Sequence, residues 1–310
     1  MTKLRKLCGT ILAAACAAFS CSARVVRDIP YDSSIGRFGL GDLFLPETGN
    51  GESIPRAKRV AEGDALAGVG TGNGAVPLVL TIHGGGWAHG DRASWEGVSR
   101  FFSEQLGFAA FNIEYRLASV SNRWPVCGND CVNAARFVLS DEFKKRFSLS
   151  HDKIWICGGS AGGHLALWTL ANLPVGDVAG CVSISAIGDP KPDFTAHRGR
   201  YNALFGAKID DASFASMNPV LKIKPGMAPL LCTHAEGDTV VPIASHRAFA
   251  DAYCAAGNRC KLFAYPCDVQ SGLKGHCIWI PGMGPYRRLI PPIENQIRDF
   301  VANTGKGLNR

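Results

Sequence analysis

The chain has 310 residues, of which 46% are hydrophobic and 19% are charged, so it is long enough to bury one large core or two small ones. Its 36 glycines and 17 prolines exclude a coiled coil or a helical bundle, because helix interiors disfavour both residues. The net charge is +7, but the basic residues are scattered without runs of like charge, which excludes a nucleic-acid-binding protein.

Residues 1–23 have the layout of an export signal. Three basic residues within the first six positions precede an uncharged run over residues 7–19, and small residues follow up to Ala23. We therefore expect the mature chain to begin near Arg24, with a net charge of about +4, and to be periplasmic or secreted.

The sequence was also searched for a transmembrane segment and for a lipid anchor. No stretch after the signal has 18 uninterrupted apolar residues, so no transmembrane segment is expected. Cys16 follows three alanines, and Cys21 follows Ala18, Phe19 and Ser20; both positions resemble degenerate lipoprotein processing sites that lack the usual large aliphatic residue. A lipid anchor at one of these cysteines stays open as the alternative to release.

The mature chain alternates short apolar runs with amphipathic stretches, which predicts one α/β domain over residues 24–310. Several runs, such as residues 78–82, are apolar without alternation, as in strands of a mostly parallel sheet with helices on both faces. The predicted strands are residues 41–46, 77–83, 108–114, 153–158, 179–186, 229–235 and 260–265. Helices are predicted around residues 98–106, 132–139, 161–173, 243–256 and 293–301.

Two segments interrupt this alternation. Residues 47–76 are rich in Gly, Glu, Ala and Thr, a composition that predicts a surface insertion between two early strands. Residues 187–226 contain several prolines and glycines and predict an irregular lobe over one end of the sheet.

A glycine-rich loop follows the strand that begins at Pro77. It reads His83-Gly-Gly-Gly-Trp87, and consecutive glycines expose backbone N–H groups without obstruction by side chains. Such a loop can donate two hydrogen bonds to an oxyanion that develops during a reaction. A plain glycine turn is the simpler alternative.

A Gly-x-Ser-x-Gly motif occupies residues 158–162, directly after one predicted strand and before a predicted helix. A serine on such a sharp turn needs glycine on both sides, because side chains would clash in the tight backbone. The turn lifts the Ser160 hydroxyl above the sheet edge, next to the N-terminus of the helix. This context predicts that Ser160 is a nucleophile.

A nucleophilic serine needs an imidazole base and a carboxylate that orients the base. Asp238 follows a predicted strand at its carboxyl end and is the preferred acid, with Glu236 as the alternative. His276 lies in a glycine-flanked loop after the next strand and is the preferred base. The weaker candidates are three histidines within or next to other elements, namely His83, His164 and His246.

Nine of the 12 cysteines belong to the mature chain, so at least one of them is unpaired. Cys157, Cys181 and Cys232 lie in apolar runs, where a thiol behaves as a small hydrophobe. An oxidising compartment permits disulfides among the other six, and we predict Cys127 with Cys131, Cys254 with Cys260, and Cys267 with Cys277. Nine free thiols are the alternative. The spacings are not those of a zinc site, and no metal or organic cofactor is expected.

Together these motifs resemble the α/β-hydrolase superfamily, in particular its exported esterase and lipase-like branch with an HGGGW loop and a GGSAGG elbow. The matching blocks run in the same order, namely residues 83–91, 114–117, 158–165, 238–242 and 275–276. The resemblance implies Ser160 as nucleophile, Asp238 as acid and His276 as base. It also implies that the N–H groups of Gly85, Gly86 and Ala161 form the oxyanion hole.

The resemblance implies a serine carboxylic ester hydrolase that works through an acyl-enzyme. Short loops favour short acyl groups, acetyl or feruloyl, on a small-molecule or glycan substrate. The alternatives are an arylformamidase, a peptidase of the prolyl oligopeptidase kind, and a non-catalytic binding protein on a hydrolase scaffold. The missing propeller repeats disfavour the peptidase, and the export signal disfavours the arylformamidase.

Overall fold

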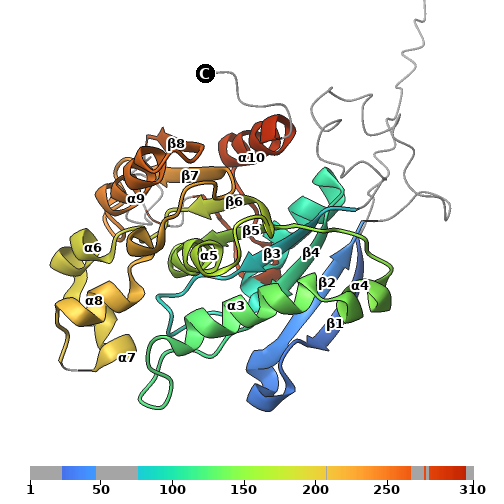
Figure 1. Ribbon diagram of the computed structural model, residues 1–310, viewed down its shortest axis with the longest axis horizontal. Helices are drawn as coiled ribbons and strands as arrows, with labels where there is room; N and C mark the ends of the chain where they lie inside the picture. The colour runs from blue at the N-terminus through green and yellow to red at the C-terminus, as the bar shows by residue number, and fades with distance from the viewer. Residues whose placement is uncertain (1–22, 47–75, 207, 267–275, 277–278, 305–310) are drawn as a thin grey trace, which may run out of the picture.

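The computed structural model describes residues 23–46, 76–206, 208–266, 276 and 279–304. Eight strands form one sheet in the order β1-β2-β4-β3-β5-β6-β7-β8 (Figure 1). The pairings of β1 with β2 and of β2 with β4 are antiparallel, and all the others are parallel. The strands are β1 (Arg24–Pro30), β2 (Leu40–Leu45), β3 (Leu78–Ile82), β4 (Ala109–Ile113), β5 (Ile154–Gly159), β6 (Val178–Ile184), β7 (Leu230–Ala235) and β8 (Cys260–Tyr265).

The helices follow the strands in the order that the sequence predicts. The main helices are α2 (Glu96–Arg100), which continues as a π-helical turn, α3 (Val126–Leu139), α4 (Asp141–Phe147), α5 (Ala161–Asn172), α9 (Ile243–Ala255) and α10 (Pro291–Thr304). Short 3₁₀ turns include η3 (Arg92–Trp95), η5 (Arg198–Tyr201) and η8 (Gly284–Tyr286). All seven predicted strands and the five predicted helices are present, so the predicted α/β fold class is confirmed.

Two hydrophobic cores lie on opposite faces of the sheet. Along β3, Leu78, Leu80 and Ile82 pack into a core with α3, α5 and α9, whereas Val79 packs into a second core with α2 and α10. Every residue of β3 is buried, because helices cover both faces of the sheet. Figure 1 shows α3 and α5 crossing one face.

The first strand, β1, was not predicted from the sequence. It lies at the edge of the sheet, where it pairs only with β2, and most of its residues are exposed or half-buried. An edge strand needs no continuous apolar run. The charged residues in RVVRDIP interrupt the apolar pattern from which the other strands were predicted. The strand begins at Arg24, the residue predicted to start the mature chain.

Of the two segments predicted to interrupt the alternation of strands and helices, the structure describes only the second. Residues 47–75 lie outside the described residues, as does the export signal up to residue 22. The segment over residues 187–226 holds a set of short helices, α6 (Pro190–His197), η5, α7 (Asn202–Phe205), α8 (Asp211–Met217) and η6 (Pro219–Lys222). Figure 1 shows α6, α7 and α8 grouped at one end of the molecule.

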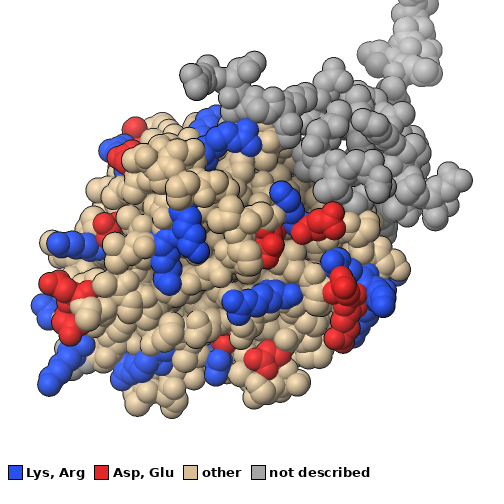
Figure 2. Space-filling view, viewed as in Figure 1, with Lys and Arg blue, Asp and Glu red and all other residues tan. Residues whose placement is uncertain are grey.

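Basic and acidic side chains are interspersed on the face shown in Figure 2, without a continuous basic stripe. Within the described ranges, no helix has the length and apolar character that crossing a membrane requires.

Candidate active site

Ser160 lies on the sharp turn between β5 and α5, with a φ of 56° and a ψ of −126°. A positive φ is unusual for a residue other than glycine and costs on the order of 1–3 kcal/mol. The turn packs tightly, since a Cβ on Gly158 would overlap the carbonyl oxygen of Gly162, and a Cβ on Gly162 would overlap that of His83. The glycines of the motif are therefore required by close backbone contacts.

His276 connects Ser160 with Asp238. Its Nε2 lies 2.9 Å from the Ser160 Oγ, and its Nδ1 lies 2.7 Å from the Asp238 Oδ2. The imidazole and the carboxylate are buried, whereas Ser160 is half-buried. The three residues chosen from the sequence thus meet in the arrangement of a hydrolytic triad, and Glu236, the alternative acid, has an exposed side chain.

Asp238 is held as a carboxylate by several donors. The backbone N–H groups of Val240 and Val241 donate to its Oδ1 at 2.9 and 2.8 Å, and the His234 Nε2 lies 3.4 Å from its Oδ2. Burial alone raises the pKa of this carboxyl, but hydrogen bonds from His234 and His276 outweigh burial and lower the pKa to about 2. Asp238 is therefore ionised at neutral pH.

His234 was missed by the sequence analysis. It is the penultimate residue of β7 and is fully buried, with its Nε2 2.9 Å from the Val241 carbonyl oxygen and its Nδ1 3.1 Å from the Nδ1 of His246. Burial, followed by the nearby His234, holds the pKa of His246 well below its ordinary value. His246 therefore contacts His234, and His276 is the histidine that contacts both Asp238 and Ser160.

The other two rival histidines brace the structure. The Trp87 indole N–H donates to the His164 Nδ1 at 3.2 Å, and the His164 Nε2 lies 2.9 Å from the Met217 carbonyl oxygen. Burial lowers the pKa of His164 to about 4, so this imidazole is neutral. The His83 ring stacks on Tyr115 with centroids 4.3 Å apart. Both histidines thus support the glycine loop and the helix next to it.

The glycine loop lies directly beside the nucleophile turn. A Cβ on Gly84 would come within 2.8 Å of the Gly159 carbonyl oxygen and 3.3 Å of the Ser160 Cβ. Gly85 and Gly86 have φ values of 123° and 59°, which favour glycine. Both line the same pocket as Ser160, and Ala161 opens α5, where the first N–H groups lack intrahelical acceptors. The three residues predicted to form an oxyanion hole are thus close to the serine.

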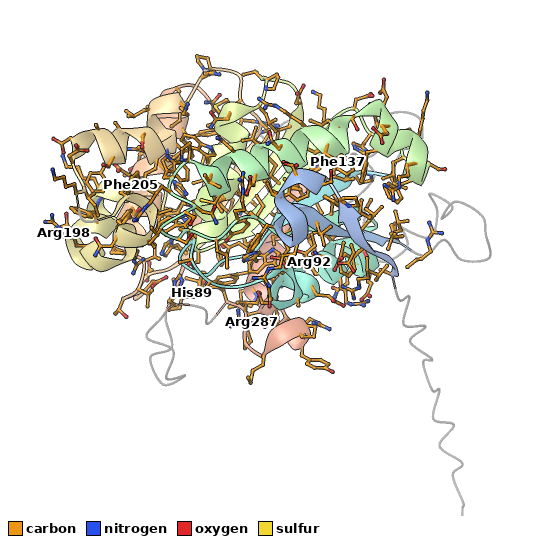
Figure 3. All side chains as sticks on the ribbon, turned by 90° about the horizontal axis from the view of Figure 1, so that it is seen from below. His89, Arg92, Phe137, Arg198, Phe205 and Arg287 are labelled. Atoms are coloured by element: carbon orange, nitrogen blue, oxygen red, sulfur yellow. The ribbon has the colours of Figure 1, made fainter. Side chains whose placement is uncertain are left out.

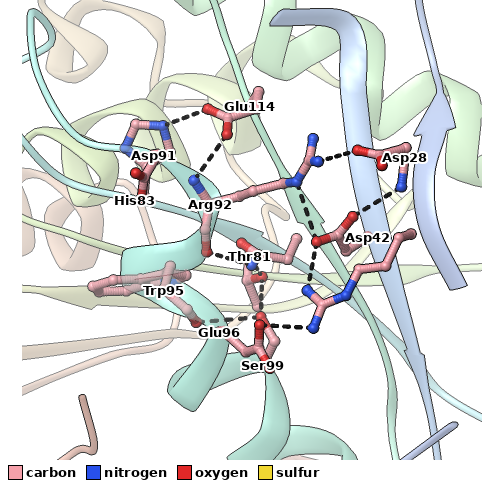
Figure 4. Close-up of polar contacts among 12 residues, drawn as sticks. Asp28, Asp42, Thr81, His83, Asp91, Arg92, Trp95, Glu96, Ser99 and Glu114 are labelled. Atoms are coloured by element: carbon pink, nitrogen blue, oxygen red, sulfur yellow. Dashed lines mark hydrogen bonds and ion pairs between the residues drawn. The ribbon is translucent and has the colours of Figure 1, made fainter. Parts of the chain in front are cut away.

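A polar network supports the far end of this loop (Figure 4). The backbone N–H of Arg92 donates to Glu114 at 3.2 Å, and its guanidinium bonds to Asp28 and, at 3.1 Å, to the buried Asp42. Glu114 also lies 3.6 Å from the His83 Nε2. The network connects the loop to β1 and β2, and it was not predicted from the sequence because its members are far apart in the chain.

The pocket around Ser160 has a volume of about 620 Å³. Its apolar wall includes Trp95 and Trp279, whose rings meet edge to face 5.5 Å apart beside Gly159. Both indoles are buried to at least 99%. Among the residues that the structure describes, no group of His, Cys, Asp or Glu is arranged to hold a metal ion.

Two of the three predicted disulfides are wrong. Cys127 and Cys131 are free thiols one turn apart on α3, where Cβ atoms lie about 5–6 Å apart, too far for the roughly 4 Å of a disulfide. Cys254 and Cys260 are also free, and the Cys254 thiol lies against the Cys260 carbonyl oxygen at 3.9 Å instead. Cys267 and Cys277, the third pair, lie outside the described residues.

Comparison with known proteins agrees with this geometry. Residues 69–174 match the model of the BD-FAE family. Over 196 residues the chain is 29% identical to esterase LipC of Mycobacterium tuberculosis, covering 56% of this chain and 47% of the relative. Over 99 residues it is 33% identical to an arylesterase of Saccharolobus solfataricus, covering 32% and 30% of the two chains. The chain thus spans half or less of the length of these curated relatives.

Solved structures of the same fold cover nearly the whole chain. A truncated carbohydrate esterase from gut microbiota superposes with a TM-score of 0.70 at 16% identity, over 93% of this chain and 99% of the other. A bacterial heroin esterase gives a TM-score of 0.62 at 19% identity, over 96% and 87%. The chain therefore has the fold of these solved esterases, and over residues 69–174 it is similar to the BD-FAE family.

Proposed function

We propose that this protein is a serine carboxylic ester hydrolase that acts on short acyl esters, acetyl or feruloyl, carried by carbohydrate or small-molecule alcohols. One observation carries the proposal: His276 lies within hydrogen-bond distance of both Ser160 and Asp238. The family match and the esterase names of the curated relatives support the reaction class.

The geometry defines a role for each residue. The ionised Asp238 accepts the Nδ1–H of His276, which leaves Nε2 free to take the proton of Ser160. The Ser160 Oγ then attacks the ester carbonyl carbon, and the His276 imidazolium returns the proton to the departing alcohol. Water, deprotonated by His276, attacks the acyl-enzyme, and the imidazolium returns this proton to the Ser160 oxygen as the acid leaves.

The carbonyl oxygen becomes an oxyanion in both halves of the reaction. The N–H groups of Gly85, Gly86 and Ala161 are the donors we assign to it, because the two glycines line the pocket with Ser160 and Ala161 follows Ser160 directly at the start of α5. The Ala161 N–H also contributes the positive end of the α5 dipole. Removing one such donor typically costs about 3 kcal/mol of transition-state stabilisation.

The size of the pocket supports small acyl groups. A volume of about 620 Å³ must hold both the acyl group and the alcohol, and part of its wall is formed by the bulky Trp95 and Trp279. One of the structural neighbours is named a carbohydrate esterase, which supports a glycan alcohol as the substrate partner.

The test is hydrolysis of 4-nitrophenyl acetate, butyrate and octanoate by the mature protein and by Ser160→Ala. We expect the acetate and the butyrate to be cleaved faster than the octanoate, and the substitution to abolish turnover. Ser216→Ala is the matched control, since the Ser216 hydroxyl donates to the Ser213 carbonyl oxygen on the exposed side of α8. Turnover that is indifferent to the loss of the Ser160 hydroxyl contradicts the proposal.

We propose in addition that residues 1–23 direct export and are removed, with a lipid anchor at Cys16 or Cys21 as the alternative form of processing. Expression in a bacterial host with the native N-terminus tests this. Sequencing of the exported protein should give a first residue near Arg24. A lipid-modified N-terminal cysteine supports the anchor, and an intact Met1 in the cytoplasm contradicts export.

A further inference from the structure

Two guanidinium groups line the pocket that holds Ser160 and His276. Arg200 reaches the pocket from η5, and Arg287 reaches it from the turn after η8. Among the described residues that line this pocket there is no Asp or Glu. The described wall therefore contains two guanidinium groups and no carboxylate, although Arg200 forms an ion pair with the buried Asp193 outside the pocket.

Hydrogen bonds to residues outside the pocket hold the Arg200 side chain in place. Its Nη1 donates to the Asp193 Oδ1 at 3.1 Å, and its Nη2 donates to the Val240 carbonyl oxygen at 2.7 Å. Asp193 is fully buried, and its other oxygen accepts the Tyr201 hydroxyl at 2.7 Å, so its negative charge is shared with a second donor. A guanidinium has five N–H donors, which leaves Arg200 with donors for a group inside the pocket.

Arg287 provides the second charge. Its Nε donates only a long hydrogen bond, 3.4 Å, to the Gly282 carbonyl oxygen, and the described part of the chain places no carboxylate within ion-pair distance of it. Figure 3 shows Arg287 and His89 toward the same edge of the molecule, far from Arg198. Among the described residues, Arg287 is thus a half-buried cation with no carboxylate partner at the pocket.

We propose that this pocket selects esters that carry a carboxylate, which Arg200 and Arg287 bind while the ester carbonyl lies at Ser160. This inference rests on the proposed ester hydrolase function. The fork of N–H groups on a guanidinium matches the two oxygens of a carboxylate, and such charge-assisted hydrogen bonds are roughly twice as strong as neutral ones. The substrate class is therefore anionic esters, with the carboxylate on the alcohol or on the acyl part.

The competing explanation is that both arginines are structural. Arg200 then only anchors the Val240 carbonyl next to the acid loop, and Arg287 only faces solvent. In that case their loss lowers the activity on charged and neutral esters alike. The ratio of kcat/KM between a charged and a neutral substrate of the same shape separates the two explanations, because a structural defect leaves the ratio unchanged.

Matched substrate pairs provide this ratio. For the alcohol part, 3-acetoxybenzoate is compared with 3-acetoxybenzamide, which releases the same acetyl group. For the acyl part, monoethyl glutarate is compared with ethyl 4-carbamoylbutanoate. We expect the carboxylate to raise kcat/KM by about tenfold or more in at least one pair at low ionic strength, and added salt to reduce this preference. The pair that responds identifies which part of the ester carries the charge.

Four variants complete the experiment. Arg200→Gln and Arg287→Gln should reduce the preference severalfold or more while the neutral ester remains a substrate. The controls are Arg198→Gln and Arg288→Gln, neighbours with the same charge that do not line the pocket. These two variants should keep the preference of the unmodified protein.

Two results would overturn the inference. One is a charged-to-neutral ratio at or below unity in both pairs, and the other is a ratio that Arg200→Gln and Arg287→Gln both leave intact. Either result still leaves the proposed function standing if Ser160→Ala abolishes cleavage of the neutral esters. If none of the four esters is cleaved in a manner that depends on Ser160, the proposed function itself fails.

Discussion

At the scale of single residues, the ionised Asp238 links the chemistry of the site to the stability of the fold. Its pKa of about 2 lies below the value of about 3.9 that an aspartate has in an unfolded chain. A carboxyl group whose pKa is lowered by folding stabilises the folded state above the unfolded pKa. That stabilisation is lost as the pH falls from about 4 to about 2.

We therefore expect Asp238→Asn to lower the free energy of unfolding at pH 7 by about 2 kcal/mol. The difference from the unmodified protein should shrink as the pH falls from 4 toward 2, because the native carboxylate becomes protonated there. Urea unfolding at pH 7, 5 and 3 measures it. Asp251→Asn, at an exposed position of α9, is the control and should show little difference at any of these pH values.

The same substitution should lower kcat at pH 7 by roughly 10³–10⁴-fold, because an amide no longer selects the imidazole tautomer that can accept the Ser160 proton. A stability difference that stays constant with pH would show that the Asp238 charge does not contribute to the fold. An unchanged kcat would show that another group orients His276.

At the scale of elements, the sequence predicts most accurately what is local. The elbow around Ser160 was recognisable because a strand, a glycine-flanked serine and a helix are adjacent in the chain. Asp238 and His276 could be chosen because each follows a predicted strand, and parallel strands bring their carboxyl ends to one edge. His234, which contacts Asp238, and the edge strand β1 were not predicted, because their roles depend on contacts between segments that are distant in the sequence.

The cysteine predictions failed for a related reason. Proximity in sequence suggested a bond between Cys127 and Cys131, but whether two nearby cysteines can bond depends on the element that contains them. A helix separates positions i and i+4 by more than a disulfide spans. The pairing could not be judged before α3 was known to begin at Val126 rather than after Cys131.

The contact between the nucleophile turn and β3 leads to a prediction about a single methyl group. A Cβ on Gly162 would overlap the carbonyl oxygens of Ile82 and His83, which are backbone atoms that cannot rotate away. We expect Gly162→Ala to cost about 2–3 kcal/mol of stability and to reduce activity by displacing the glycine loop. Thermal unfolding and kcat on 4-nitrophenyl acetate measure the two effects.

Gly199→Ala is the matched control, since nothing lies within 4 Å of a Cβ placed there. It should change stability by less than about 0.5 kcal/mol. Equal effects of the two substitutions would mean that the packing of the elbow against β3 does not limit the size of residue 162.

At the scale of the whole molecule, the alkylation rates of the thiols show which parts of the protein are accessible to solvent. Cys127, Cys131, Cys157, Cys181 and Cys232 are buried, whereas Cys254 is exposed. Burial raises the pKa of the Cys127 thiol to about 12, so it stays protonated as well as inaccessible. Among the cysteines that the structure describes, Cys254 should be alkylated first in the folded protein.

Iodoacetamide labelling followed by peptide mass spectrometry tests this expectation. The five buried thiols should react only after denaturation, and Cys254→Ser should remove the fast-reacting site. Fast labelling of Cys127 or Cys131 in the folded state would contradict the buried position of α3. A peptide in which these two cysteines are bonded would contradict their free state.

The pairing of Trp95 with Trp279 gives the molecule an optical reporter of its own active site. The two indoles meet beside Gly159, and both line the pocket of Ser160. An ester that enters should change the polarity around them and shift the intrinsic emission. We expect this shift when Ser160→Ala binds uncleaved ester, and a smaller shift in Ser160→Ala/Trp279→Phe, where only Trp95 of the pair remains. Occupancy could then be followed by fluorescence, without any coloured leaving group.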